Sequence, residues 1–158
     1  RERALDALVV AARSLPPAPD LRIEALHEML GSFLCRRGHP LARKRGGVSF
    51  ADVQRYPIAS TPLSDEVARV MVERYGEAAH PAHCVTLRCE EISSLVEVAQ
   101  RTDAVLLAIR AAGPMLAELR MRPALESTAR FGIVTLARRT QAPALSIVRE
   151  LMRKLMRD

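Results

Sequence analysis

Apolar and polar positions follow two different periods along this chain of 158 residues. Short apolar or alternating runs predict strands, and apolar residues spaced three or four apart predict helices. The expected strands cover residues 6–11, about 29–36, 56–59, 82–89, 104–109 and 131–137, and the expected helices cover 62–75, 93–101 and 143–156. Strands that alternate with helices indicate an α/β fold with crossover connections.

Some parts of this pattern are less regular than others. The first strand, residues 6–11, is apolar on both faces, so we expect it to be fully buried, as strands of parallel sheets are. The proline-rich residues 16–19 predict a stiff, extended connector after it. Residues 21–26 fit a helix and a strand equally well, and residues 116–125 carry a mixed pattern.

Capping and breaking residues place the ends of the 62–75 helix. Pro62 suits the first turn of a helix. The backbone N–H that proline lacks would have no partner within the helix at that position. Thr61 or Ser64 can cap this start with a side-chain oxygen, and Gly76 can end the helix.

The second strand is followed by a corner, Gly38-His39-Pro40-Leu41-Ala42. Pro40 has no backbone donor and disfavours helical geometry at His39, so the corner ends the strand and His39 is expected to be extended. We expect His39 to pack or to cap rather than to catalyse. A second turn, Arg45-Gly46-Gly47, leads to a short helix that Ser49 is expected to cap.

Taken in order, these pieces resemble the effector-binding domain of LysR-type transcriptional regulators. In that family a strand, a "GHPLA" corner, a short helix and a strand with Tyr-Pro follow one another, as residues 30–59 do here. Further segments similar to the family's are 5–10, 90–99, 106–107 and 130–135, so the likeness spans nearly the whole chain.

The chain departs from the family pattern at two positions. Arg101-Thr102-Asp103 replaces a Gly-x-Gly turn, and Ala108 replaces a proline. The turn must therefore be built differently, and Asp103 is expected to supply the left-handed or capping conformation that glycine usually gives.

The resemblance implies an α/β, bilobal fold similar to type 2 periplasmic binding proteins. It assigns residues 1–32 and 109–158 to a first lobe and residues 33–108 to a second lobe. It also implies that the first lobe is incomplete in this chain and that the family's N-terminal winged helix-turn-helix is absent from it.

The function that the resemblance implies is that of a sensor domain and not of an enzyme. A small, anionic effector would bind in the cleft between the lobes, without a cofactor. The regulator would assemble as a homodimer or homotetramer and would contact DNA through the missing N-terminal domain. We expect no membrane contact and a cytoplasmic location, because no signal peptide and no membrane-length apolar run is visible.

The residues expected to bind the effector follow the Tyr56–Ala59 strand. A strand end that opens into a helix offers unpaired backbone N–H groups, which attract anions and carboxylates. In the second lobe we expect this site to comprise Ser60, Thr61, Pro62, Leu63 and Ser64. In the first lobe the resemblance places Ala11 at the cleft, where it would add little polar contact. The same pattern also fits an ordinary helix cap without a ligand.

The net charge of the chain adds little to the predicted function. The formal net charge is +6 and the pI is about 10.0, which favours anionic partners. Much of the arginine lies between Arg101 and Arg157, and no single helix combines a basic cluster with base-reading neighbours. We therefore interpret the excess of arginine as a solvated surface.

Candidate catalytic and metal-binding residues do not form a recognised pattern. His80-Pro81-Ala82-His83-Cys84 with Cys89 matches no common zinc spacing, so we expect a surface loop that leads into a strand and no metal site. The acidic pairs Asp65-Glu66 and Glu90-Glu91 are better interpreted as first-turn acids that complement a helix dipole than as a general acid and base.

Other proteins with this scaffold remain as alternatives. A type 2 periplasmic solute-binding protein, or a non-catalytic binding domain of the same fold, would share the two lobes. An enzyme on the same scaffold would need an acid and base pair in the cleft.

Overall fold

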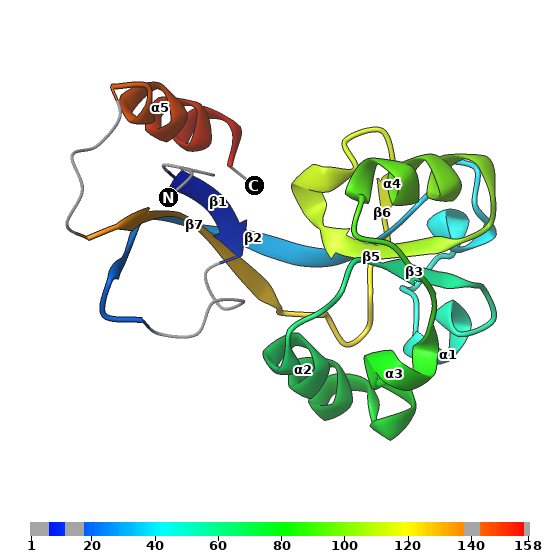
Figure 1. The fold of residues 1–158 in the computed structure, drawn as a ribbon. Helices are drawn as coiled ribbons and strands as arrows, with labels where there is room; N and C mark the ends of the chain where they lie inside the picture. The colour runs from blue at the N-terminus through cyan, green and yellow to red at the C-terminus, as the bar shows by residue number, and fades with distance from the viewer. Residues whose placement is uncertain (1–6, 12–17, 138–142, 157–158) are drawn as a thin grey trace. The chain divides into compact units, whose positions relative to one another are not determined.

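The computed structural model describes residues 7–11, 18–137 and 143–156 (Figure 1). These residues form two compact units: unit 1 comprises Arg1–Met29 and Ala129–Asp158, and unit 2 comprises Leu30–Thr128. The strands are β1 (Ala7–Ala11), β2 (Leu21–Cys35), β3 (Ile58–Ser60), β4 (Val85–Arg88), β5 (Val105–Ile109), β6 (Ala117–Glu118) and β7 (Thr128–Leu136). The helices are α1 (Phe50–Val53), α2 (Asp65–Tyr75), α3 (Pro81–Cys84), α4 (Ile92–Arg101) and α5 (Leu145–Leu155), with short 3-10 turns η2 (Pro40–Arg43), η3 (Glu77–Ala79) and η4 (Arg110–Ala112).

Unit 1 contains β1, most of β7, the first part of β2 and the helix α5. β1 pairs antiparallel with β7, from Ala7 opposite Thr135 to Ala11 opposite Phe131. The expectation that β1 is buried on both faces is wrong, since Leu8 and Val9 point to opposite faces and are 44% and 46% exposed. Within the described residues β1 pairs with one strand only, which explains this exposure.

β2 resolves the ambiguity of residues 21–26, because it is a single strand of 15 residues. The charged side chains Arg22, Glu24 and Glu28 occupy alternate positions, which is the period of a strand. Arg149 of α5 forms an ion pair with Glu24, and Arg130 of β7 forms one with Glu28 at 2.5 Å. Both ion pairs therefore join residues of unit 1.

Unit 2 is built on a sheet with the order β2-β5-β3-β4, in which β6 also pairs with β2. β3 runs parallel to both β4 and β5, whereas β5 runs antiparallel to β2. Figure 1 shows α1, α2 and α3 on one face of this sheet and α4 on the other. One buried cluster lies on each face, around Phe33 and Met71 and around Leu95 and Leu106 respectively.

The corner at residues 38–42 forms as expected. His39 is extended, with φ −62° and ψ 141°, and Pro40 begins η2. The His39 ring is fully buried, its Nδ1 accepts a hydrogen bond from the N–H of Leu41 at 3.0 Å, and its Nε2 lies 3.1 Å from the Asp103 carbonyl oxygen. His39 therefore caps η2 and packs in the interior of unit 2.

The predicted starts of α2 and β4 are wrong. The helix expected from Pro62 begins at Asp65, because the extended residue Ser64 is its N-cap, so Pro62 lies in the connection before it. The strand expected at 82–89 covers only 85–88. Residues before it form α3, whose first turn Pro81 suits and His80 caps by accepting from the N–H of Ala82 at 3.2 Å.

The turn after α4 is built by Thr102. Its Oγ1 donates to the Val98 carbonyl at 2.8 Å and accepts from the N–H of Ala104 at 3.1 Å. Among the described non-glycine residues only Glu126 has a positive φ, so the left-handed conformation expected of Asp103 does not occur. Asp103 acts differently, because its carboxylate binds Arg36 at 2.7 Å and its carbonyl faces His39.

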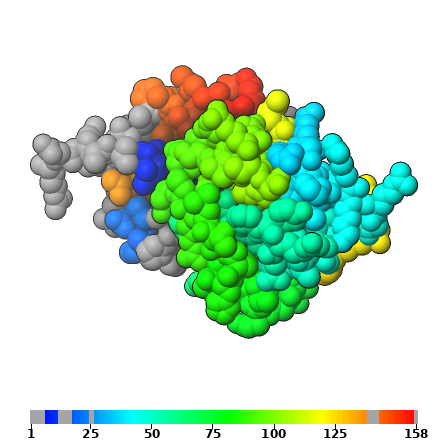
Figure 2. Space-filling view, turned by 90° about the vertical axis from the view of Figure 1, so that its right-hand side faces the viewer, coloured from blue at the N-terminus to red at the C-terminus, as the bar shows by residue number. Residues whose placement is uncertain are grey.

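Residues 109–128, which were predicted to belong to the first lobe, group with unit 2 in this structure. The functional division into two regulatory lobes stays a prediction. Residues 36–48 and 118–122 of unit 2 lie side by side, as cyan and yellow atoms in Figure 2. None of the helices in the described residues has the length and apolar character needed to cross a membrane.

Candidate functional site

Ser60 ends the central parallel strand of unit 2. It pairs with Arg88 at the end of β4 and with Leu107 of β5. Its side chain is fully buried, and its hydroxyl lies within donor distance of two carbonyls, Leu107 at 3.0 Å and Thr61 at 2.8 Å. The hydroxyl of Ser60 therefore holds the end of the strand together, and it is less available to a ligand than the sequence suggested.

Thr61, Pro62 and Leu63 connect this strand end to α2. They are partly buried or exposed, so they are accessible at the carboxyl edge of the sheet. Ser64 follows as the N-cap, and its Oγ accepts from the N–H of Val67 at 3.4 Å. The structure thus brings the five predicted residues of unit 2 into one continuous strand-to-helix connection.

Acidic residues modify the electrostatics of this helix start. Asp65 and Glu66 lie in the first turn of α2, where carboxylates complement the positive end of the helix dipole. They confirm the sequence interpretation of this pair as first-turn acids. The Asp65 carboxylate repels an incoming anion, so the start of α2 is a weaker anion site than an uncharged helix start.

A second helix start lies at the same edge, which sequence reasoning did not place there. β4 is the parallel neighbour of β3, and it leads through Cys89 and Glu90 to α4. Glu91 caps α4, since its Oε1 accepts from the N–H of Ser93 at 3.2 Å and from the Ser93 hydroxyl at 2.8 Å. These bonds lower the pKa of Glu91. Only the pairing of β3 with β4 reveals this proximity.

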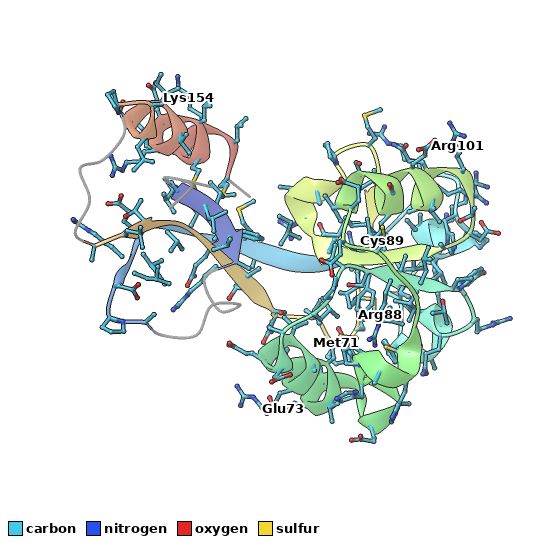
Figure 3. All side chains as sticks on the ribbon, viewed as in Figure 1. Met71, Glu73, Arg88, Cys89, Arg101 and Lys154 are labelled. Atoms are coloured by element: carbon cyan, nitrogen blue, oxygen red, sulfur yellow. The ribbon has the colours of Figure 1, made fainter. Side chains whose placement is uncertain are left out.

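Arg88 and Cys89 follow the same strand but point differently. Figure 3 places Cys89 near the ends of β3 and β5 and Arg88 on the side of α3. The Arg88 guanidinium donates to the Pro81 carbonyl at 2.9 Å, and Cys89 Sγ accepts from the N–H of Glu91 at 3.4 Å. The side chain of Arg88 is therefore directed away from the strand end that carries Ser60, although the two residues pair through the main chain.

The remaining predicted ligand residue, Ala11, is the last residue of β1 in unit 1, where it pairs with Phe131. Its contribution to a ligand site stays a prediction.

Unit 2 also contains a cavity of about 520 Å³ beside β2, lined in part by Ser32, Arg110, Glu118 and Ser127. The Glu118 carboxylate accepts from the Ser32 hydroxyl at 2.7 Å and binds the Arg110 guanidinium at 3.0 Å. Ser32, Arg110 and Glu118 therefore satisfy one another and leave few of their own donors for a ligand.

Thiol and metal chemistry find little support in this structure. Cys35 and Cys84 are buried, and burial raises the pKa of Cys35 to about 11 and also raises that of Cys84, which disfavours the reactive thiolate. Over the described parts of the chain, no three His, Cys, Asp or Glu side chains are arranged to hold a metal ion.

Comparison with known proteins gives a consistent result. A family model described as the LysR substrate binding domain matches residues 1–157. The SDS degradation transcriptional activation protein of Pseudomonas sp. (strain ATCC 19151) is 30% identical over 157 residues, which cover 94% of this chain and 50% of that protein. The chain thus spans about half the length of this curated relative.

Two solved structures share the fold at low sequence identity. HinK, a LysR family transcriptional regulator from Pseudomonas aeruginosa, has a TM-score of 0.65 and 12% identity, over 96% of this chain and 52% of its own. The effector binding domain of QuiR in complex with shikimate has a TM-score of 0.61 and 13% identity, over 95% of this chain and 71% of its own.

Proposed function

This chain belongs to the family of LysR substrate binding domains, and from that premise we propose that it is the effector-sensing domain of a transcription regulator. The family confirms two expectations from the sequence, the type 2 periplasmic-binding-protein-like fold and the absence of an enzyme activity. The alternative of a periplasmic solute-binding protein is not retained, because the family and the curated relative are those of transcription regulators.

The proposed effector site is the strand-to-helix connection Ser60–Ser64. One observation supports it most directly: β3 and β4 are parallel neighbours, and each leads from the same edge into a helix start. Ligands of α/β proteins bind beyond the carboxyl ends of such strands. Thr61 and Ser64 carry the hydroxyls best placed to donate to a ligand, since the Ser60 hydroxyl is directed at main-chain carbonyls. Ala11 is proposed to contribute from unit 1.

The acids around this connection restrict the proposed effector. Asp65 and Glu91 add negative charge at the two helix starts. A molecule with a single anionic group and an apolar body suits this surrounding better than one with several anionic groups. The names of two related proteins suggest suitable probes, because one relative is named for SDS degradation and another structure holds shikimate.

The first prediction is that a singly charged organic anion binds to this connection. We expect a short-chain alkyl sulfate below its micelle concentration, or shikimate, to release or absorb heat in calorimetric titration of the chain. The double variant Thr61→Val, Ser64→Ala removes both hydroxyls. Because hydrogen bonds to charged groups contribute about 1.5–3 kcal/mol, we expect binding at least about tenfold weaker in this variant.

The control variant is Ser94→Ala, which removes an exposed hydroxyl from α4. It should bind as the unmodified chain does, and the uncharged alcohol of the same chain length should bind weakly to both. Equal affinities of the double variant and the control, or no heat with any singly charged anion, would contradict the proposed site.

We extend the proposal to the complete regulator. It assembles as a homodimer or homotetramer in the cytoplasm and contacts DNA through a domain outside this chain. Effector binding shifts the population of its assembled conformations, because the effector binds some of them more tightly than others. Light scattering of the complete protein with and without effector measures this change.

A further inference from the structure

Unit 2 gathers positive charge from two segments that are far apart in the sequence. Residues 36–48 contain five Arg or Lys and no Asp or Glu, and residues 118–122 contain two Arg and one Glu. The main chain joins these segments at Val48, whose N–H donates to the Arg120 carbonyl at 2.9 Å and whose carbonyl accepts from the N–H of Arg122 at 2.8 Å. We call the four side chains of Arg43, Arg45, Arg120 and Arg122 the basic surface.

The four arginines are held on the solvent side of this junction. Met121 is 7% exposed and faces the core, so Arg120 and Arg122 on either side of it face outward. Arg122 lies across Gly47, where an added Cβ would come within 2.6 Å of its Cγ and Cδ. Arg43 and Arg45 are also exposed, and the two segments form one flank of unit 2 in Figure 2.

Three nearby cations are neutralised by carboxylates, and Arg37 donates to the Met115 carbonyl at 3.3 Å, whereas among the described residues the arginines of the basic surface have no such partner. Lys44 is paired with Asp52, Arg36 with Asp103 and Arg110 with Glu118. In the described ranges none of the four arginines of the basic surface forms an ion pair with a carboxylate. The surface therefore keeps a local excess of positive charge.

A shallow hollow accompanies this charge. A cavity of about 390 Å³ is lined in part by Lys44, Arg45, Gly47 and Arg120. Glu118 also lines it, but this carboxylate is already bound to Arg110 and Ser32. The hollow thus presents guanidinium groups, which bind phosphate oxygens through two parallel N–H donors.

We propose that the basic surface binds the phosphate backbone of double-stranded DNA, without regard to sequence. Neither segment contains Asn or Gln, and Arg43, Arg45, Arg120 and Arg122 project from a 3-10 turn and irregular segments, so no helix carries them into a groove. The partner is duplex because single strands need exposed aromatic rings for stacking, and the phenylalanine and tyrosine rings of unit 2 are buried or half-buried.

This inference goes beyond effector sensing and requires no effector. A regulator that belongs to this family works at DNA, so phosphate contacts from the sensor domain would add affinity and hold the domain close to the duplex. Four arginine contacts correspond to a slope of about −3.6 when log K is plotted against log salt concentration.

The second prediction tests this with the chain itself and a fluorescent duplex of arbitrary sequence, by anisotropy between about 50 and 200 mM salt. The variant Arg45→Gln, Arg120→Gln should bind about 100-fold more weakly at the lowest salt, and its salt slope should be smaller by about 2. The matched control is Arg69→Gln, Arg101→Gln, which removes the same charge from α2 and α4, where Arg69 pairs with Glu73 and Arg101 with Glu97.

The control should stay within about threefold of the unmodified chain, and circular dichroism should show both variants folded. The proposal is overturned if no duplex binds at the lowest salt, or if both variants lose affinity equally, because binding would then follow net charge. Displacement of the duplex by polyglutamate at equal charge would overturn it in favour of an acidic protein. Effector titrations are independent of these results, so the two proposals can fail separately.

Discussion

At the scale of single residues, hydrogen bonds to one carboxylate organise the loop before α1. The Asp52 carboxylate accepts from the Ser49 N–H at 2.9 Å and from the Ser49 hydroxyl at 2.7 Å, and it pairs with Lys44. The Lys44 hydrogen bond, followed by those of Ser49, holds the pKa of Asp52 well below its usual range. Ser49 and Asp52 form a capping box, which the sequence predicted only as a cap at Ser49.

The third prediction follows from the sign of this shift. Since the pKa of Asp52 is lower in the folded chain than in the unfolded chain, its stabilisation is present above about pH 4 and is lost as the pH falls through the folded value. Asp52→Asn should lower the free energy of unfolding at neutral pH and weaken its decline in acid. Urea titrations from neutral to acidic pH measure both effects. Asp20→Asn makes the same charge change at an exposed turn, and an identical acid profile for the two variants would contradict this account.

At the scale of elements, the sequence predicted most strands and helices but not which strands pair with one another. The apolar run at 104–109 and the spacing of Leu95, Val96 and Ala99 correspond to β5 and α4, since burial on one sheet face creates those periods. α2 begins at Asp65 and not at Pro62, because the side chain of Ser64 caps the helix at that point. The pairing of Ser60 with Arg88 depends on contacts between distant segments, which no local pattern encodes.

The fourth prediction concerns the turn that positions the basic surface. Gly46 and Gly47 have φ of 87° and 98°, a conformation that costs an L-residue about 1–2 kcal/mol. An added Cβ at Gly46 meets nothing within 4 Å, whereas one at Gly47 meets Arg122. Gly47→Ala should therefore lower the free energy of unfolding more than Gly46→Ala, by up to about 1 kcal/mol. Urea titration in an Arg122→Ala background should remove this difference, and a difference that persists would show that Arg122 is not its cause.

At the scale of the whole chain, each unit has its own buried core. Among the described residues, unit 2 contains a cluster that includes Phe33 and Met71 and another that includes Leu95, whereas the cluster of unit 1 includes Ile133 and Met152 and has fewer members. β2 and β7 supply residues to both units. Because burial of apolar side chains stabilises a core, we expect the amides around the smaller described cluster of unit 1 to exchange through openings of lower free energy.

The fifth prediction separates the two cores by hydrogen exchange and mass spectrometry. Met71 and Met152 are 0% and 5% exposed, and truncating a buried methionine to alanine costs about 2–5 kcal/mol. Met71→Ala should lower protection in α2, β3 and β5, because these elements contribute residues to the same buried cluster as Met71. Met152→Ala should lower protection in α5, β1 and the part of β7 in unit 1, and it should leave α4 unchanged. If each substitution instead lowered protection evenly in both units, the chain would open as one cooperative unit, and its effector response would have to arise from global rather than local changes in stability.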